Sequence, residues 1–445
     1  MRSVARFAAA LALIAACCTT STVQQQERRS EGQLLPSEPE VRLDGQPFPA
    51  AAPHDPRFPE PRRTFHVDAE GAAPGDGSAE RPWTDLQAAL CRLEPGDRLM
   101  VAPREYTGPF HIGAGCRDGN ADAPIQLFAP DAFLLPGRSG DVLTIERAHW
   151  QLSRVQLALR DSRAAGLVLA GAGAHHLAVD RSHISEGDGA AVRITGGASD
   201  VTISNSHIHH SGGVAIDGAA RIRLLNNHVH HNRASGVAVA GAREITISGN
   251  RIHNDRDSAI AVSCGSGVSI AHNRIWNAAP AAISMECGSA AVKAAAEPPH
   301  SIEQNAIIEA TIAIRLNGTE GVAIRRNYFE NLLTTGSTAL LLGNAREIRF
   351  HNNVVNRYSA PVRVTSSAAG VSVANNLFLA PSETWPPPAG SAAFSFIGHN
   401  AVAGAESLAG RELGTVSGVH TVDAGKAMTG EPFRGAAPDI GVAER

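Results

Sequence analysis

The chain has 445 residues, of which only 18% are charged and 43 are glycine. This length is ample for a large buried core, and the glycine content argues against long helices and for many turns. The net charge of −4 gives no global basic field, so we expect no nucleic-acid partner. Lysine is nearly absent, with Lys293 and Lys426 as the only two, which restricts the bases available to a catalytic site.

Residues 1–16 have the pattern of an export signal. Arg2 and Arg6 precede a short apolar run, residues 7–16, that is too short to span a bilayer. The run ends in Ile-Ala-Ala before Cys17, which resembles the bacterial lipobox, whose cysteine is lipidated and starts the mature chain. Cys18, and not Asp, then follows it, which implies an outer-membrane lipoprotein facing the periplasm. The alternative is an ordinary signal peptide and a secreted protein.

The next two segments lead into the main domain. Residues 17–64 are rich in proline and polar residues and show no period, which predicts a disordered tether. Residues 65–96 read as a strand, a loop and an amphipathic helix that follows Asp85. The helix buries Trp83, Leu86 and Leu90 on one face, and we expect it to cap the first coil of a solenoid.

Residues 97–396 repeat one pattern about every 23 residues. Three apolar-x-apolar triplets recur in each repeat, separated by Gly, Asn, Ser and Asp. They form three columns that keep register together, for example Ile222-x-Leu224, Val237-x-Val239 and the triplet centred on inward Val229. A polar column lies two residues before the inward Ile or Val, at Ser182, Ser206, Asn227, Asn250, Asn273, Asn305, Asn327, Asn353 and Asn376.

Three period-two triplets per repeat indicate one turn of a single-stranded parallel β-helix, so the fold class is all-β. Inward residues should stack on their counterparts at roughly 4.8 Å, and the asparagine column should form a hydrogen-bonded ladder at a bend. We assign the triplets Ile260-x-Val262 and Ile312-x-Ile314 to the third column. An insertion interrupts the repeats at about residues 288–299, and residues 397–445 are expected to form an irregular C-terminal cap.

With these elements placed, the chain resembles the right-handed parallel β-helix proteins of the pectate-lyase-like superfamily. The segments HVDAEG, RPWTDLQAAL and EPGDRLMVAPREYTG are similar to the usual entry of that group, and APDIGVAE is similar to its closing segment. The resemblance implies a polysaccharide lyase or epimerase more readily than a glycoside hydrolase. The superfamily also includes non-catalytic members, so the fold alone does not give the reaction.

The chain departs from the superfamily's catalytic signatures. Lyases of the chondroitinase B type use a lysine base and an arginine near calcium, whereas here Lys293 lies in the insertion and no coil position is lysine. The Asn-Thr-Asp, Asp-Asp and Gly-His-Gly signatures of polygalacturonase-like hydrolases are missing. Of the Asp-Pro-His-Asp motif of mannuronan epimerases, only Pro-His-Asp occurs, at residues 53–55 in the tether, and we treat this match as chance. No cofactor is firmly implied, and a role for Ca²⁺ stays open.

Four cysteines lie beyond the export signal. Cys91 on the cap helix and Cys116 in an early turn are candidates for a disulfide in an oxidising compartment. Cys264 and Cys287 are one repeat apart, so stacking places their Cα atoms at about 4.8 Å, within the disulfide range. A free stacked pair is the alternative for the second pair.

A polar wall is predicted beside a flat strip of alanine. Outward histidines flank the inward residues of three successive coils, and the following turns hold Glu186, Asp188 and further charged residues. The outward residues of the next triplets are Ala215, Ala238 and Ala261. Such a strip beside imidazoles, guanidinium groups and carboxylates suits an acidic, uronate-containing polysaccharide.

Removal of the C5 proton of a uronate, by β-elimination or epimerisation, needs a cation on the carboxylate and a base. We assign His230 and His253 as base and acid, and Asp255 as the catalytic residue that orients them. The predicted substrate-binding residues are His209, Arg233, Arg251, Arg256 and Asp257.

Three other interpretations stay open. Outward histidines in such repeats often only fill turns. His207, His209, His228 and His230 have a spacing that suits zinc or copper, although no supporting carboxylate is identifiable. The chain is alternatively a non-catalytic glycan-binding or scaffold protein of the envelope. We expect a monomer whose partners are the polysaccharide and, through the lipid anchor, the membrane.

Overall fold

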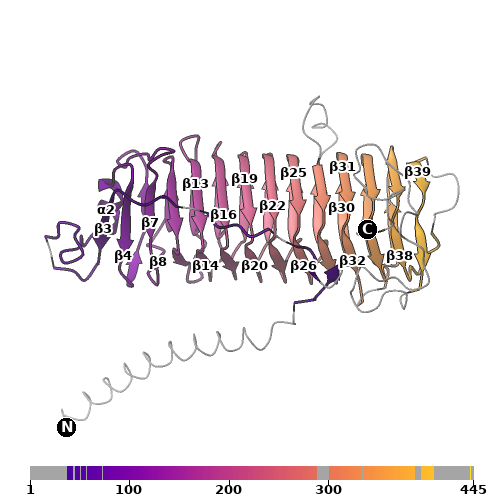
Figure 1. The fold of residues 1–445 in the computed structure, drawn as a ribbon, viewed down its shortest axis with the longest axis horizontal. Helices are drawn as coiled ribbons and strands as arrows, with labels where there is room; N and C mark the ends of the chain where they lie inside the picture. Colours follow the sequence, from indigo (N-terminus) through magenta and orange to yellow (C-terminus); the bar gives the residue numbers. More distant parts are fainter. Residues whose placement is uncertain are drawn as a thin grey trace, which may run out of the picture. The chain divides into compact units, whose positions relative to one another are not determined.

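Three parallel sheets wind into a β-helix in the computed structural model (Figure 1). The structure describes residues 38–43, 46–50, 52–56, 58–72, 74–287, 300–332, 335–385, 392–404 and 441. Each turn passes through sheet 1, then sheet 2, then sheet 3. The export signal, Cys17, the insertion with Lys293, and most of the predicted C-terminal cap lie outside the described residues.

The strands of each sheet are short and pair only with the preceding and following turns. Sheet 1 has 14 strands: β3 (Arg63–Val67), β4 (Asp97–Val101), β7 (Ile125–Phe128), β10 (Trp150–Ser153), β13 (His175–Asp180), β16 (Ser199–Ser204), β19 (Ala220–Leu225), β22 (Arg243–Ser248), β25 (Ser266–Ala271), β28 (His300–Glu303), β31 (Glu320–Arg325), β34 (Arg346–His351), β37 (Val371–Ala374) and β39 (Phe394–Gly398). Sheet 2 has 13 strands: β5 (Glu105–Thr107), β8 (Phe133–Leu135), β11 (Gln156–Ala158), β14 (His183–Ser185), β17 (His207–His209), β20 (His228–His230), β23 (Arg251–His253), β26 (Arg274–Trp276), β29 (Ala306–Ile308), β32 (Tyr328–Glu330), β35 (Val354–Asn356), β38 (Leu377–Leu379) and β40 (Ala401–Ala403). Sheet 3 has 11 strands: β6 (Phe110–Ile112), β9 (Leu143–Ile145), β12 (Leu167–Ala170), β15 (Val192–Thr195), β18 (Val214–Asp217), β21 (Val237–Ala240), β24 (Ile260–Ser263), β27 (Ile283–Glu286), β30 (Ile312–Asn317), β33 (Thr338–Gly343) and β36 (Ala360–Val364).

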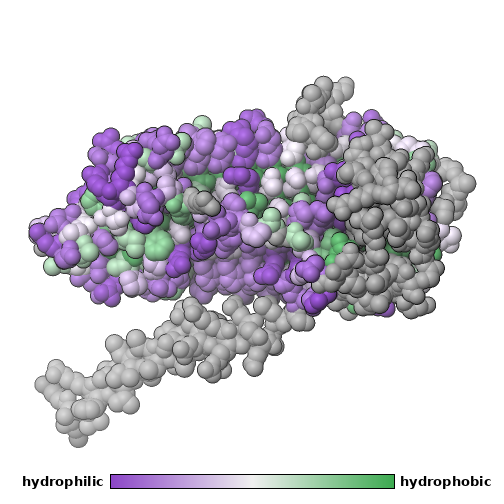
Figure 2. Space-filling view, viewed as in Figure 1, coloured by the Kyte–Doolittle hydropathy of each residue, from purple (hydrophilic) through white to green (hydrophobic). Residues whose placement is uncertain are grey.

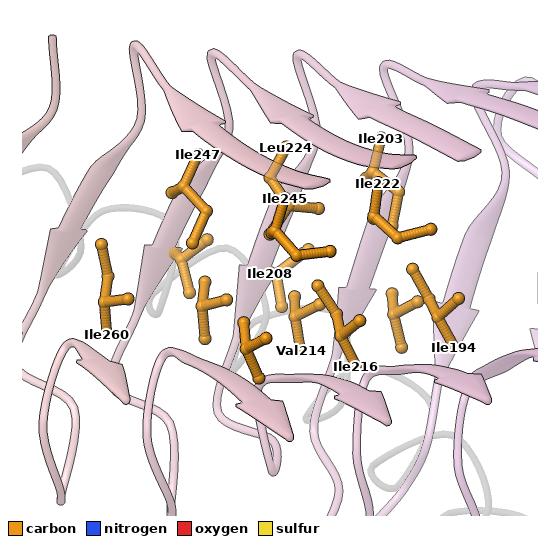
Figure 3. Packing of buried hydrophobic residues seen from close by; sticks show 14 of the residues in the cluster. Ile194, Ile203, Ile208, Val214, Ile216, Ile222, Leu224, Ile245, Ile247 and Ile260 are labelled. Atoms are coloured by element: carbon orange, nitrogen blue, oxygen red, sulfur yellow. The ribbon is translucent and has the colours of Figure 1, made fainter. Parts of the chain in front are cut away.

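The core is a stack of inward aliphatic side chains, as the repeat predicted. Figure 3 shows Ile222 and Ile245 of sheet 1 facing Ile216 and Ile194 of sheet 3 across the interior. All of these side chains are at most 1% exposed. Because successive turns pair in register, each inward residue packs on its counterpart, and the core continues along the β-helix.

An asparagine ladder marks the bend between sheets 1 and 2. In each turn the backbone N–H donates to the side-chain oxygen of the next asparagine, for example Asn250 to Asn273 at 2.9 Å and Asn273 to Asn305 at 2.9 Å. The side-chain amide of Asn273 also donates to the Ile247 carbonyl at 2.8 Å. The ladder is confirmed, and it extends by one rung to Asn400, beyond the predicted last coil residue at 396.

Two disulfides join the predicted cysteine pairs. Cys91 is bonded to Cys116 with a Cα–Cα distance of 4.1 Å, and Cys264 to Cys287 with 4.6 Å. The first joins helix α2 (Leu86–Arg92) to the turn after β6. The second joins two adjacent turns of the β-helix, at the residues that directly follow β24 and β27. Helix α2 lies where the amphipathic cap helix was predicted, and its Leu86 and Leu90 are buried. No helix in the described part of the chain is long and apolar enough to cross a bilayer.

Part of the predicted tether is an ordered strap along the β-helix. The strap (the described residues 41–43, 46–50, 52–56 and 58–62) runs across the turns between sheets 1 and 2 (Figure 1, indigo trace). Asn205 and Asn226 donate to the carbonyls of His54 and Ala52 at 2.9 and 3.1 Å, and Arg181 pairs with Asp55 at 2.9 Å. The expectation of disorder is therefore wrong over this stretch, because the corner asparagines supply partners that composition does not reveal.

Apolar contacts anchor the strap at its N-terminal end. A hairpin of β1 (Arg42–Leu43) and β2 (Gln46–Pro47) holds Val41 and Phe48, which are 0% and 4% exposed. They cover an apolar patch on the outer face of sheet 2, formed by Trp276, Ala306, Ile308, Tyr328, Val354, Leu377 and Leu379. This end of sheet 2 is thus closed to ligands by the chain itself.

Replacing Phe48 with alanine should release the strap. Loss of a buried phenylalanine costs about 3 kcal/mol or more, so the open strap population should rise roughly 100-fold. Limited trypsin digestion within the strap, after Arg42, Arg57 or Arg62, should become faster by roughly the same factor. Leu332→Ala is the matched control, because Leu332 is 42% exposed. Equal digestion rates of Phe48→Ala and wild-type protein would show that the strap is not held by this contact.

Candidate functional site

The outer face of sheet 2 carries a histidine ladder in two stacked columns. The first column is His183, His207 and His228, and the second is His209, His230 and His253. Parallel pairing in register stacks the rings, with centroids 5.1 Å apart for His183 and His207 and 4.9 Å for His230 and His253. The second column ends on the indole of Trp276, 4.0 Å from His253.

Hydrogen bonds join the two columns obliquely, from one turn to the next. The Nε2 atoms of His183 and His209 lie 2.6 Å apart, as do those of His207 and His230, and those of His228 and His253 lie 2.9 Å apart. A neutral imidazole has one donor and one acceptor nitrogen, so one proton satisfies each such contact. The ladder therefore consists of three oblique hydrogen-bonded pairs that stack on one another.

Two corner histidines, His210 and His231, extend this network to the surface. Their Nδ1 atoms lie 2.7 Å from the Nδ1 atoms of His209 and His230, respectively. Both have left-handed backbones, with φ of 49° and 52°, because the chain bends here into sheet 3. Their own rings stack at 5.4 Å. His210 is exposed, and His231 is half-buried like the three histidines of the first column.

Burial makes the second column a poor source of catalytic bases. His209, His230 and His253 are 6%, 2% and 1% exposed. Burial, reinforced by the neighbouring imidazoles, lowers the pKa of His209 to about 2 and that of His253 to about 3, and it also lowers the pKa of His230. The assignment of His230 and His253 as base and acid, and of His209 as a substrate ligand, therefore does not fit their inaccessible positions.

Asp255 is a structural residue of a second ladder. Its Oδ1 accepts from the backbone N–H and the side-chain amide of Asn232, both at 2.9 Å, and Asn232 in turn accepts from Ser211. The residue is 7% exposed, and burial raises the pKa of its carboxyl to about 7. Asp255 thus holds the turn after sheet 2, and the predicted role of orienting a catalytic histidine does not match these partners.

The predicted arginines lie in different settings. The Arg233 guanidinium pairs with Asp188 and, at 3.4 Å, with Asp161, so two carboxylates already occupy it. Arg251 continues the first histidine column, in register with His228. Arg256 is exposed and has no ion-pair partner among the described residues.

Asp257 is also exposed, and its carboxylate caps its own turn by accepting from the Ser258 N–H at 2.8 Å. Arg256 and Asp257 lie in the turn that precedes β24. Arg256 presents an unpaired guanidinium to solvent there.

The alanine strip is confirmed on the outer face of sheet 3. Ala215, Ala238 and Ala261 pair in register on β18, β21 and β24, and all three are partly exposed. Arg193 precedes them on β15, while Ser284 and Arg315 follow on β27 and β30. We call this row of six residues the sheet 3 ribbon.

The arginines at both ends of the sheet 3 ribbon were missed from the sequence. Arg193 was visible as the middle residue of Val192-x-Ile194. Arg315 was hidden, because the triplet was read as Ile312-x-Ile314, whereas the structure pairs Ile283 with Ile314 and Ser284 with Arg315. The two guanidinium groups are 42% and 30% exposed, and their nearest carboxylates lie 3.8 Å away.

Two surface hollows, of about 620 and 320 Å³, lie on sheet 1 in the described part of the chain. The larger one is lined by His176, Asp200, Arg221, Arg223 and Glu244, on the largely hydrophilic face seen in Figure 2. Arg221 and Asp200 form a two-bond ion pair there, at 2.7 and 2.8 Å, so their charges are mutually satisfied.

Three groups of three histidines bring their nitrogen atoms within 4.8 Å of one another in the described part of the chain. They are His149, His175 and His176; His183, His207 and His209; and His207, His228 and His230. Imidazole nitrogen suits zinc and copper, whereas calcium prefers oxygen ligands.

The comparisons support the fold. The family model for a right-handed β-helix region matches residues 153–296. The solved structure of XylC with xylose is 10% identical, with 76% of this chain and 86% of that chain covered and a TM-score of 0.53. Together they show a right-handed parallel β-helix.

Two further solved structures are similar at lower scores. Pectate lyase Pel9A is 14% identical, with 86% and 97% covered and a TM-score of 0.45. The A-module of mannuronan C-5 epimerase AlgE4 from Azotobacter vinelandii is 14% identical, with 79% and 100% covered and a TM-score of 0.42. No curated protein sequence matched the chain.

Proposed function

We propose that this right-handed parallel β-helix binds an acidic, uronate-containing polysaccharide along the sheet 3 ribbon. The observation that carries the proposal is the in-register row from Arg193 through the alanines to Arg315. Five strand spacings separate the two arginines, so the row is roughly 24 Å long. A narrow, flat strip of this length suits an extended polymer better than a small molecule.

The charges along the ribbon favour a polyanion. Arg193 and Arg315 each form one partly exposed ion pair, at 3.8 Å, and such pairs are weak in water. Arg256 lies in the turn before β24 and has an unpaired guanidinium. Guanidinium groups bind carboxylates in bidentate geometry, so Arg193 and Arg315 at the two ends of the row, with Arg256 in the turn before β24, suit a chain with a repeating carboxylate.

Turnover of the bound polymer is the finer part of the proposal. β-Elimination or C5 epimerisation needs an accessible base, and among the histidines of the ladder and its corners His210 is the exposed one, with His231 stacked on it. His231 has a lowered pKa, mainly because of burial, which favours its neutral, basic form at neutral pH. The burial of His230 and His253 favours the second candidate, a non-catalytic glycan-binding protein of the envelope.

The location follows from the export segment. We propose that Cys17 is lipidated and that the chain is an outer-membrane lipoprotein facing the periplasm. Mass spectrometry of the mature N-terminus should find diacylglycerol and acyl groups on Cys17. Recovery of an unmodified N-terminus, cleaved elsewhere, would indicate a secreted protein.

Binding should be measured with alginate, polygalacturonate and a neutral polysaccharide of similar length. We expect saturable binding of a polyuronate only, weakened roughly 10-fold by Arg256→Ala, since a charge-assisted hydrogen bond contributes about 1.5–3 kcal/mol. Ala238→Arg should block the strip sterically. Arg349→Ala is the matched control, because this exposed arginine lies on β34 of sheet 1. Binding that is unchanged in both Arg256→Ala and Ala238→Arg would rule out the sheet 3 ribbon as the binding site.

Turnover is tested on the same polymers. Ultraviolet absorbance detects unsaturated ends from elimination, and NMR detects epimerised units. If the chain is an enzyme, the double variant His210→Ala, His231→Ala should lose activity while His253→Gln retains it. Binding with neither product would identify the non-catalytic alternative.

A further inference from the structure

We propose that the histidine ladder binds one zinc or copper ion through His207 and two further imidazoles. The ion is held either with His183 and His209 or with His228 and His230, because each of these triads brings its ligand atoms within 4.8 Å. This site lies on sheet 2, separate from the sheet 3 ribbon, and it goes beyond the proposed polysaccharide binding.

The ligand chemistry selects the class of ion. Every ligand is an imidazole nitrogen, which is the donor that late first-row divalent ions prefer. Three protein ligands with a fourth position open to solvent is the usual arrangement of an accessible zinc site. His183 and His207 are half-buried at the edge of the ladder, so an ion there has a route from solvent.

The His183–His209 pair requires only a small movement to hold an ion. Nε2 of His183 and Nε2 of His209 are 2.6 Å apart in the structure. Two nitrogens bound tetrahedrally to one zinc, with bonds of about 2.0–2.1 Å, lie about 3.3 Å apart. Opening the pair by under 1 Å is within the reach of side-chain torsions on the partly exposed His183. The ion then takes the place of the proton that the two nitrogens share.

The corner histidine provides the outer partner that such a site needs. For His209 to coordinate through Nε2, its proton must be on Nδ1 and must be donated to an acceptor. Nδ1 of His210 lies 2.7 Å away, and the exposed ring of His210 can carry its own proton on Nε2 in water. His210 thus fills the position for which the sequence offered no carboxylate.

Sharing of His207 fixes the stoichiometry. Both triads use His207, so they cannot both be complete, and the ladder should hold one ion and not two. Loss of His209 should leave the triad with His228 and His230 intact, and loss of His230 should leave the triad with His183 and His209. Loss of His207 should remove both.

The experiment uses the full chain with its disulfides intact, stripped with EDTA. The variant His176→Ala serves as the background, because it removes the separate group of His149, His175 and His176. Zinc binding is followed by calorimetry, and the copper-loaded protein is examined by electron paramagnetic resonance for coupled nitrogens.

We expect one ion per chain and a signal from three imidazole nitrogens. Loss of an outer partner typically weakens metal binding roughly 10–100-fold, and His207→Gln should weaken it by more than this. His209→Gln or His230→Gln alone should weaken binding much less, because one triad stays complete. The His209→Gln, His230→Gln double variant should match His207→Gln. Two ions per chain, fewer than three coupled nitrogens in the background protein, or unchanged binding by a folded His207→Gln would each overturn the proposal.

Discussion

Lowering the pH from 7 to 4.5 in EDTA is expected to destabilise the β-helix by several kcal/mol. His209, His230 and His253 have lowered folded-state pKa values, so the unfolded chain binds more protons below its ordinary histidine pKa of about 6.5. Their stabilisation is present above that pKa and is lost as the pH falls through it. The loss is about 2–3 kcal/mol for each ring at pH 4.5.

Asp255 acts in the opposite direction over the same range. Its folded pKa of about 7 lies above the unfolded value of 3.8, so its stabilisation is present at low pH and is lost as the pH rises toward 7. Acidification should therefore recover about 3 kcal/mol here. Because burial also lowers the pKa of His207 to about 3, the combined loss from the four rings is larger, and the net loss should still be several kcal/mol. Urea unfolding followed by circular dichroism at the two pH values measures this difference.

Two variants separate the contributions. Asp255→Asn keeps an oxygen for Asn232 but removes the titration, so its acid-induced loss should be larger than that of the wild type. His253→Gln should show a loss smaller by about 2.5 kcal/mol. An acid response that is the same in all three proteins would show that neither the buried rings nor Asp255 controls it.

Replacing Asn273 with alanine is expected to cost about 2–6 kcal/mol. The Asn273 side chain is 0% exposed, accepts from the N–H and side-chain amide of Asn250, and donates to the Ile247 carbonyl. Removing it leaves the buried N–H of Asn250 and the Ile247 carbonyl without this partner, at about 1–3 kcal/mol each. The side-chain amide of Asn250 keeps its bonds to the Leu224 and Ser248 carbonyls. Such a loss is comparable with the whole stability of many domains.

The chain itself supplies a graded control for this substitution. Serine occupies the same column at Ser182 and Ser206, where the Ser206 hydroxyl accepts from the Ser182 N–H at 3.1 Å. Asn273→Ser should therefore lose less stability than Asn273→Ala. Asn344→Gly, at an exposed left-handed position, should change little. Equal effects of the serine and alanine variants would contradict the account of the ladder.

The repeat pattern was sufficient to predict the β-helix, because inward residues must alternate in every turn. It predicted the asparagine ladder and the register of Ala215 with Ala238 and Ala261. It failed at residues 312–316, where Ile312, Ile314 and Leu316 alternate as one long run and two registers satisfy the same period. Pairing with Ile283 decides between them, and only the structure shows that pairing.

Accessibility was the second limit. Alternation places His230 and His253 on the outside of sheet 2, and an outward residue was expected to be exposed to solvent. Stacked rings bury one another, however, so these outward residues are 2% and 1% exposed. The strap was missed for a related reason: Val41 and Phe48 are isolated apolar residues in a polar stretch, and their burial depends on a patch formed far along the chain.

The most direct test of the proposed function is a hydrogen-exchange map of the chain with and without a bound polyuronate oligomer. The account predicts protection on β18, β21 and β24 and in the turn at Arg256, and loss of that protection in Ala238→Arg. Protection confined to the sheet 1 hollow near Arg221, or no saturable binding of any polyuronate, would contradict it.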